Sequence, residues 1–154
     1  MGESEIVRAL DRLSYGVYLI CAKTEERRNA MTAAWVVQVS GKPPLVLVAV
    51  NKSHYTSELI PKAGSFSVNV LRPDQFELAK RCGFGSGRNI DRLAGVKTAV
   101  KVTGAPVLVD CAAYLDCTLK ESFDVGDHLL FVGEVVAAGD NEQPVMVYDP
   151  QRFF

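Results

Sequence analysis

Apolar residues recur at every second position in several short segments of this chain, and this period constrains the fold more than any other feature. The alternation is clear in residues 15–19, 66–70 and 115–119. A period of two is that of a β-strand with one buried face. Residues 45–50 and 129–136 are more continuously apolar, which predicts strands that a core, a helix or a partner subunit covers on both faces. The chain is therefore predicted to be mainly β and antiparallel.

The helical patterns are brief, because glycine and proline interrupt them. They predict short helices that begin near Ser4, Thr56 and Pro73, with Ser4 as the cap of the first helix and Pro61 close to the end of the second. Strands do not alternate with long helical segments, which argues against a parallel sheet. Antiparallel strands with a few short helices favour a closed barrel, because closure removes exposed strand edges.

The length and charge of the chain limit the class of protein. Its 154 residues contain no segment that resembles a linker, so we expect one domain over residues 1–154 with a sizeable core. The formal net charge of −1 and the pI near 6.1 do not indicate the excess of basic residues that nucleic-acid-binding proteins carry. No apolar run approaches the roughly 18 residues of a membrane span. Because residues 1–5 also differ from a signal peptide, we expect a cytoplasmic protein that binds neither nucleic acid nor membrane.

The cysteines give no indication of a metal site. Cys21, Cys82, Cys111 and Cys117 form no Cys-x-x-Cys pair, and no histidine lies nearby at the spacing of zinc ligands. Cys117 fits a core position, whereas Cys82 at the end of a predicted helix is expected to be more exposed. Reduced thiols fit a cytosolic chain, and we expect no bound metal.

A run of small and polar residues lies at one end of a predicted β-hairpin. Its three alanines have little side chain, so a planar ring could lie against the backbone and hydrogen-bond to its N–H and C=O groups. The Thr32 hydroxyl can donate or accept a hydrogen bond. The alternative is an ordinary strand without a ligand. The candidate ligand-binding residues here are Asn29, Ala30, Met31, Thr32, Ala33, Ala34 and Trp35.

A polar, basic turn lies at the other end of the same hairpin. Lys52 brings a positive charge and Ser53 a hydroxyl, and either Ser53 or Thr56 could cap the helix that follows, whose N-terminus attracts anions. Asn51, Lys52, Ser53 and Thr56 are therefore candidate phosphate-binding residues. A small-residue segment together with a basic turn suits a flat ligand that carries a phosphate. The alternative is a strand, a polar turn and a capped helix.

A glycine-rich segment at residues 83–88 differs from the dinucleotide-binding fingerprint. Its spacing is Gly-x-Gly-x-Gly-Arg, it follows a helical pattern, and no βαβ unit surrounds it. Its backbone donors, together with Ser86 and Arg88, could instead meet an anion. An ordinary loop after a helix is an equal alternative.

Several motifs follow one another in an order that is typical of a known family. Asn-x-Met-Thr-Ala at residues 29–33 precedes Ser-x-x-Pro-Pro-x-Val-x-Val at 40–48, then Phe-Ser-Val-Asn-Val-Leu at 66–71 and Gly-Asp-His at 126–128. With these motifs the chain resembles the flavin reductase-like, FMN-binding split-barrel family over residues 13–153. It is also similar to the flavoredoxins and to the flavin domain of high-molecular-weight rubredoxins.

The resemblance implies a mainly β, Greek-key FMN-binding split barrel of about six strands, which holds FMN noncovalently and forms a homodimer. It places the glycine-rich loop near the flavin phosphate, which adds Ser86, Gly87 and Arg88 to the candidate cofactor-binding residues. It also associates His128 with the NAD(P)H site and makes His128 the catalytic candidate. Without the resemblance, Gly126 and Asp127 would indicate only a hairpin turn.

The implied function is that of an NAD(P)H:FMN oxidoreductase. NAD(P)H would reduce FMN, and the electrons would pass to free flavin, ferric iron or a protein partner. The sequence leaves two alternatives open: a flavoredoxin-like FMN electron carrier that a protein partner reduces, and a flavin-binding module without turnover. Because the chain has only two histidines for acid–base work, the demanding chemistry would be the cofactor's.

Overall fold

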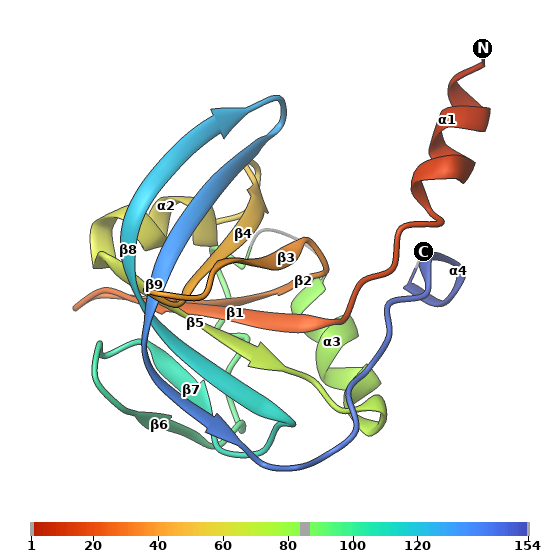
Figure 1. Cartoon of the computed structure of the whole chain (residues 1–154). Helices are drawn as coiled ribbons and strands as arrows, with labels where there is room; N and C mark the ends of the chain where they lie inside the picture. Colours follow the sequence, from red (N-terminus) through yellow and green to blue (C-terminus); the bar gives the residue numbers. More distant parts are fainter. Residues whose placement is uncertain (1, 84–86, 154) are drawn as a thin grey trace.

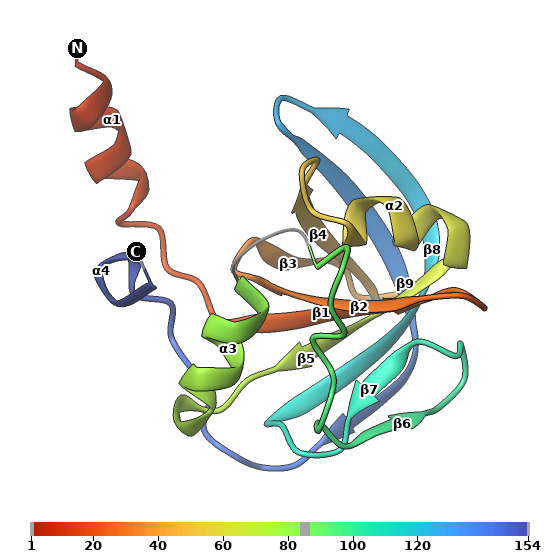
Figure 2. The ribbon, with the colours of Figure 1, turned by 180° about the vertical axis from the view of Figure 1, so that it is seen from behind.

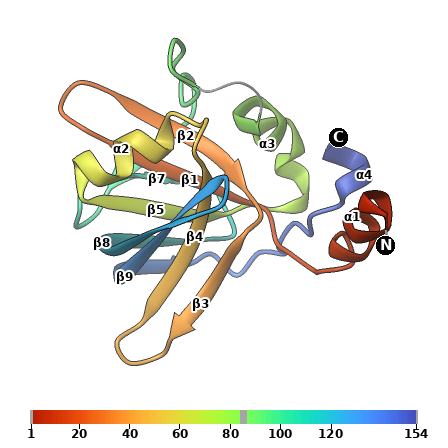
Figure 3. The ribbon, with the colours of Figure 1, turned by 90° about the horizontal axis from the view of Figure 1, so that it is seen from above.

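The computed structural model describes residues 2–83 and 87–153, and antiparallel sheet dominates it (Figure 1). The strands of the main sheet lie in the order β2-β1-β5-β8-β9-β4-β3. The sheet curves until β2 and β3 approach each other, as the view from above shows (Figure 3). The predicted split-barrel fold is confirmed. The strands are β1 (Tyr18–Lys23), β2 (Arg28–Ala33), β3 (Val36–Ser40), β4 (Leu45–Asn51), β5 (Ser65–Val70), β8 (Ala113–Val125) and β9 (His128–Asp140).

The connection from β4 back to β5 gives the sheet its Greek-key topology. The chain forms the β1–β2 hairpin, crosses to the β3–β4 hairpin at the opposite end of the strand order, and returns through α2 (Thr56–Ala63) to β5 beside β1. The long β8–β9 hairpin then joins the two halves, because β8 pairs with β5 and β9 pairs with β4. The predicted hairpin between the small-residue segment and the basic turn is β3–β4.

Shorter elements surround the barrel (Figures 1 and 2). A two-stranded hairpin, β6–β7, packs against β5, and α1 extends away from the barrel near α4 and the C-terminus. None of the described helices is long and apolar enough to cross a membrane. These elements are β6 (Thr98–Val100), β7 (Pro106–Leu108), α1 (Glu3–Leu10), η1 (Pro73–Gln75), α3 (Phe76–Gly83) and α4 (Pro150–Phe153).

Strands β1 and β5 are buried on both faces, although the sequence predicted one buried and one exposed face. In β1, Ile20 and Ala22 pack inside the barrel with Phe66 of β5. Leu19 and Cys21 point to the other face, where a second core contains residues of α3 and of the C-terminal segment. The prediction is wrong because distant segments cover the second face, and the period of a single strand does not reveal them.

The polar positions of β5 and β8 are buried because they bind the backbone of the β6–β7 hairpin and its loop. Asn69 Oδ1 accepts a hydrogen bond of 2.9 Å from Leu108 N. The Asp116 carboxylate accepts hydrogen bonds from the backbone N–H groups of Val102 and Thr103, at 2.9 and 3.0 Å. A polar group can be buried at little cost when it is hydrogen-bonded in this way. The second sheet face therefore carries polar side chains and is nevertheless covered.

Two helix boundaries differ from those predicted. Ser4 lies inside α1, whose N-cap is Gly2. Helix α2 continues past Pro61 and ends at Gly64, whose φ of 69° is the left-handed conformation that glycine adopts most readily. Pro73 does occupy the first turn of η1, as predicted.

The four cysteines are free and buried. Burial raises the pKa of the Cys21 and Cys117 thiols to about 12. Cys117 lies in the barrel core, as predicted. The expectation for Cys82 is wrong, because α3 turns this side chain into the second core, where it is fully buried.

Candidate functional site

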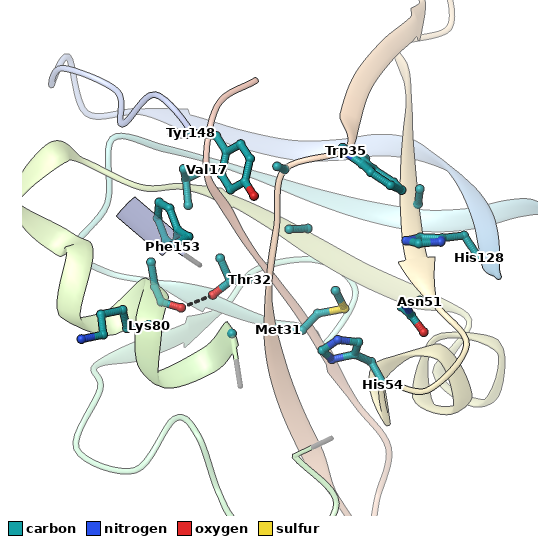
Figure 4. Close-up of a pocket in the computed structure, with 15 residues that line it drawn as sticks. Val17, Met31, Thr32, Trp35, Asn51, His54, Lys80, His128, Tyr148 and Phe153 are labelled. Atoms are coloured by element: carbon teal, nitrogen blue, oxygen red, sulfur yellow. Dashed lines mark hydrogen bonds between the residues drawn. The ribbon is translucent and has the colours of Figure 1, made fainter. Parts of the chain in front are cut away.

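A cavity of about 260 Å³ lies where β2, the end of β4, the start of β9, α3 and the C-terminal segment meet (Figure 4). Alanine side chains line part of its wall, and aromatic rings stand at its sides. This combination leaves room for a flat ligand and gives it apolar contacts. The lining residues are Val17, Met31, Thr32, Ala33, Ala34, Trp35, Ala49, Asn51, His54, Ala79, Lys80, Gly83, His128, Tyr148 and Phe153.

Strand β2 and the bend after it supply the small-residue wall. Because β2 lies at one end of the strand order, alternate backbone N–H and C=O groups of this strand point away from its partner β1 and can meet a ligand. After Ala33 the chain turns into β3, and Trp35 O accepts a hydrogen bond of 3.0 Å from Ala49 N. This bond holds Trp35 against the end of β4. Residues 31–35, which are among the candidate ligand-binding residues, therefore line the cavity.

Three members of the predicted segment have structural contacts of their own. Ala30 is fully buried in the second core and does not line the cavity. The Thr32 hydroxyl donates a hydrogen bond of 2.6 Å to Ala79 O, which ties β2 to α3 (Figure 4). Thr32 still lines the cavity, but its proton is already engaged. Asn29 is also buried, and its Nδ2 donates to Thr56 Oγ1 at 3.1 Å.

His128 lines the cavity at the point where the β8–β9 turn enters β9. Its ring lies 4.7 Å from the Trp35 ring, centroid to centroid, at an interplanar angle of 35°. Its Nδ1 lies 2.6 Å from Asp127 Oδ1, and this hydrogen bond with the imidazole lowers the pKa of the Asp127 carboxyl. Gly126 has a φ of 56°. The motif is therefore both a hairpin turn and part of the cavity wall.

The basic turn lies outside the cavity lining, apart from Asn51. Lys52 Nζ is 2.5 Å from Asp124 Oδ1 and donates to Gly126 O at 2.8 Å, so the lysine holds the β8–β9 turn. Ser53 N and Oγ both donate to Asn51 Oδ1, at 2.9 and 2.8 Å. The predicted capping is wrong: the N-cap of α2 is Tyr55, and no side chain caps this helix.

The glycine-rich loop approaches the start of β2. Gly87 has a φ of 81°, and a Cβ atom here would lie 2.4 Å from Asn29 Oδ1, so only glycine fits. Arg88 pairs with Glu58, and its guanidinium lies 4.8 Å from the centre of the Tyr55 ring. Arg88 therefore lies beside α2 rather than in the cavity. Ser86, the third predicted residue of this loop, lies outside the described residues.

His54 and Arg92 are among the residues at or beside the cavity that the sequence did not indicate. His54 is half-buried and lines the cavity. Arg92 is 1% exposed, and its Nη1 donates to Ala30 O and Cys82 O at 3.1 and 3.0 Å. Burial lowers the pKa of Arg92. No local pattern marks either residue, because neighbours from distant segments surround them.

The C-terminal segment brings two aromatic rings to the cavity. Met146 O accepts a hydrogen bond of 3.2 Å from Val17 N, and Tyr148 N donates to Tyr15 O at 2.9 Å. These bonds fix the segment beside β1. The rings of Tyr148 and Phe153 stack with their centroids 5.4 Å apart. The arrangement adds an aromatic wall next to the alanines of the β2–β3 bend.

Comparison with known proteins agrees with this geometry. The family described as flavin reductase like domain matches residues 10–154, and the resemblance inferred from the motifs is thereby confirmed. The high molecular weight rubredoxin of Moorella thermoacetica is 38% identical over 133 residues, which are 85% of this chain and 58% of the rubredoxin. This chain thus spans little more than half the length of that relative.

Two further relatives are named as reductases or oxidoreductases. A ferric-chelate reductase (NAD(P)H) of Archaeoglobus fulgidus is 32% identical over 134 residues, which cover 86% of this chain and 79% of the reductase. Among solved structures, the NADH:FAD oxidoreductase of Streptomyces globisporus has a TM-score of 0.87 at 26% identity, and the match covers 95% of this chain and 88% of that one.

Proposed function

This chain belongs to the flavin reductase-like domain family, and from that premise we propose that its cavity binds FMN and that NAD(P)H is its electron donor. The observation that carries the proposal is the cavity wall, where an edge strand with small side chains lies opposite two histidines. Bound flavin supplies hydride acceptance and electron transfer, so the chain itself has to bind, orient and shield the ring. The family and its reductase relatives directly support a flavin-dependent reductase.

The residues of the cavity divide this work between them. Backbone groups of residues 32–34 would hydrogen-bond the N5 and O4 edge of the ring and so tune its potential. Trp35 and Tyr148 would flank the ring. Lys52, Ser53 and Arg88 lie on the solvent side of the loops that border the cavity, where their cations and hydroxyl can meet a phosphate at the surface. His128 would orient the nicotinamide.

FMN, rather than FAD, is proposed because the sequence contains no fingerprint for an adenosine moiety. We expect the purified protein to be yellow and to release FMN when it is denatured. Chromatography of the extract against FMN and FAD standards measures this. An extract that contains only FAD would show that the proposed cofactor is wrong and would place this chain with its NADH:FAD oxidoreductase relative.

The role of His128 can be separated from flavin binding. With His128→Ala we expect slower reduction of bound FMN by NAD(P)H in anaerobic stopped-flow mixing, while FMN affinity and the visible spectrum change little. Reduction by dithionite serves as the control, because it needs no nicotinamide site. Equal NAD(P)H reduction rates in wild type and variant, at matched FMN occupancy, would remove His128 from the site.

A carrier function is the second candidate, because the high molecular weight rubredoxin relative contains this domain beside additional sequence. As a carrier, the chain would bind FMN but receive electrons from a protein partner. An oxidised-flavin band that neither NADH nor NADPH bleaches would favour the carrier. A preparation that takes up FMN but passes electrons to no acceptor after chemical reduction would favour a flavin-binding module without turnover.

The sheet also supports a homodimer. Val37 of β3, Leu47 of β4 and Val132 of β9 are register partners, as are Leu130 of β9 and Phe123 of β8. None of these five belongs to either core cluster, so they form an apolar outer face on strands whose inner face packs in the barrel. Val37 and Phe123 are 54% and 47% exposed. A contiguous apolar face of this kind is typical of a partner surface, and we propose that a second copy covers it.

A further inference from the structure

His54 holds a place in the cavity that no step of the proposed function uses. It comes from the loop between β4 and α2, and Figure 4 shows its ring pointing toward the cavity. Its backbone is fixed, because His54 N donates to Asn51 O at 3.0 Å and His54 O accepts from Ser57 Oγ at 2.7 Å. The ring is therefore presented by a loop with little freedom to turn it elsewhere.

The hydrogen bonding of the ring indicates which nitrogen carries the proton. His54 Nδ1 is buried, and the described residues provide no hydrogen-bond partner for it. A buried N–H group without an acceptor is rarer and costs more than a lone pair without a donor. The favoured tautomer therefore has its proton on Nε2, on the opposite side of the ring. His54 then has one N–H donor, at Nε2, and the lone pair of Nδ1 remains buried in the protein.

The charges around His54 favour the neutral ring. Burial lowers the pKa of His54, and the nearby Arg92 guanidinium and His128 imidazole lower it further. Arg92 reaches this region from the loop after α3, and His128 reaches it from β9. At neutral pH the cavity wall thus contains an uncharged N–H donor, which adds no positive charge to attract a phosphate and can donate to an acceptor atom of a ring.

We propose that His54 is a further flavin-binding residue, which donates a hydrogen bond from Nε2 to an acceptor atom of the flavin ring. The inference rests on the proposed function, because it requires a flavin in this cavity. A hydrogen bond to a charged acceptor is about twice as strong as one between neutral groups. A donor at the ring therefore binds the more negatively charged reduced flavin better than the oxidised form, and it raises the midpoint potential.

Two variants of the 154-residue chain test the role of His54. His54→Phe keeps a ring of similar size and removes the donor, whereas His54→Gln keeps an N–H group at about the reach of Nε2. In fluorescence titration of apoprotein with FMN, we expect the dissociation constant to rise about three- to tenfold in His54→Phe and to recover most of the way in His54→Gln. Spectroelectrochemistry should also show a more negative midpoint potential in His54→Phe than in His54→Gln. A tenfold weaker relative affinity for reduced flavin corresponds to about 30 mV for a two-electron couple.

A measurement on the unmutated chain keeps the test independent of folding defects. The chain has only two histidines, so a protein labelled with ¹⁵N-histidine gives two imidazole spin systems, which the His54→Gln spectrum assigns. We expect a neutral His54 with its proton on Nε2, and a downfield shift of that proton when FMN binds. The same shift with or without FMN, or an unchanged potential and dissociation constant in His54→Phe, would overturn the inference. If wild-type apoprotein takes up no flavin, the proposed function fails as well, so the two failures are distinguishable.

Discussion

Two pairs of strands in the same sheet are covered in different ways. β1 and β5 are buried on both faces by side chains of their own chain, which come from the barrel interior on one side and from the second core on the other. β4 and β9 are buried mainly on the barrel side, and their outer face is apolar and partly exposed apart from Val132, which is buried. β1 and β5, which are buried on both faces, hold the fold together. β4 and β9 border the cavity and have an apolar face available to a partner.

The largest effect on the free energy of unfolding should come from a substitution in β1 or β5, the strands that are buried on both faces. Phe66 is fully buried in the barrel core. Phe66→Ala removes a large core side chain, which typically costs about 3–5 kcal/mol. We expect that loss in the free energy of unfolding, measured by urea denaturation. Val109→Ala is the control, because Val109 is 54% exposed in the loop between β7 and β8, outside the proposed partner face, and we expect it to lose at most roughly 1 kcal/mol. Equal losses for Phe66→Ala and Val109→Ala would contradict the comparison.

A substitution in the apolar outer face of β3, β4, β8 and β9 should change the assembly of the protein rather than its core. Val37→Lys places a charge in the apolar outer face, and we expect it to shift the protein from dimer to monomer in light scattering. Val102→Lys is the control, because Val102 is similarly exposed in the loop between β6 and β7, outside this face. A wild-type mass near 17 kDa at micromolar concentration would contradict the proposed dimer, since the chain itself has a mass of 16.8 kDa.

The smallest effect concerns the cations around the cavity. Lys52→Ala and Arg88→Ala should each weaken FMN binding, because a hydrogen bond to a charged group contributes about 1.5–3 kcal/mol. Each cation already has a carboxylate partner, Asp124 or Glu58, so we expect the lower end of this range, roughly a tenfold rise in the dissociation constant. Lys42→Ala, at the far end of the β3–β4 hairpin, is the control. Unchanged constants in both variants would assign Lys52 and Arg88 to the surface ion pairs alone.

The sequence predicted what depends on neighbours along the chain. The strands and the β3–β4 hairpin follow from local composition and period, and residues 31–35, which the sequence indicated as candidate ligand-binding residues, line the cavity. It did not predict that a second core covers β1, because that core is assembled from segments as far apart as Leu19 and Met146. His54 and Arg92 were missed for the same reason: their burial is created by loops and strands that are remote in sequence.

The roles of the polar residues were harder to predict than their positions. Thr32, Lys52 and Asn29 lie near the site, but each has a hydrogen-bond partner within the protein that sequence spacing does not reveal. A hydroxyl, an ammonium or an amide in a ligand-binding motif can serve the ligand or the scaffold. The choice depends on which polar groups the fold brings beside it: here a backbone carbonyl of α3, a backbone carbonyl of the β8–β9 turn and the Thr56 hydroxyl of α2.

The strand order has a consequence for how the protein acquires its site. The cavity is lined by residues from Val17 to Phe153, and its two histidines meet only after β4 has paired with β9 across some seventy intervening residues. Pairings between such distant segments form slowly, because the chain loses the entropy of closing a long loop before the contacts between the strands contribute favourable free energy. No early fragment can hold a flavin, so the ligand binds the native state alone. Flavin uptake must then follow folding in time, and the stability it adds grows with the logarithm of the free flavin concentration.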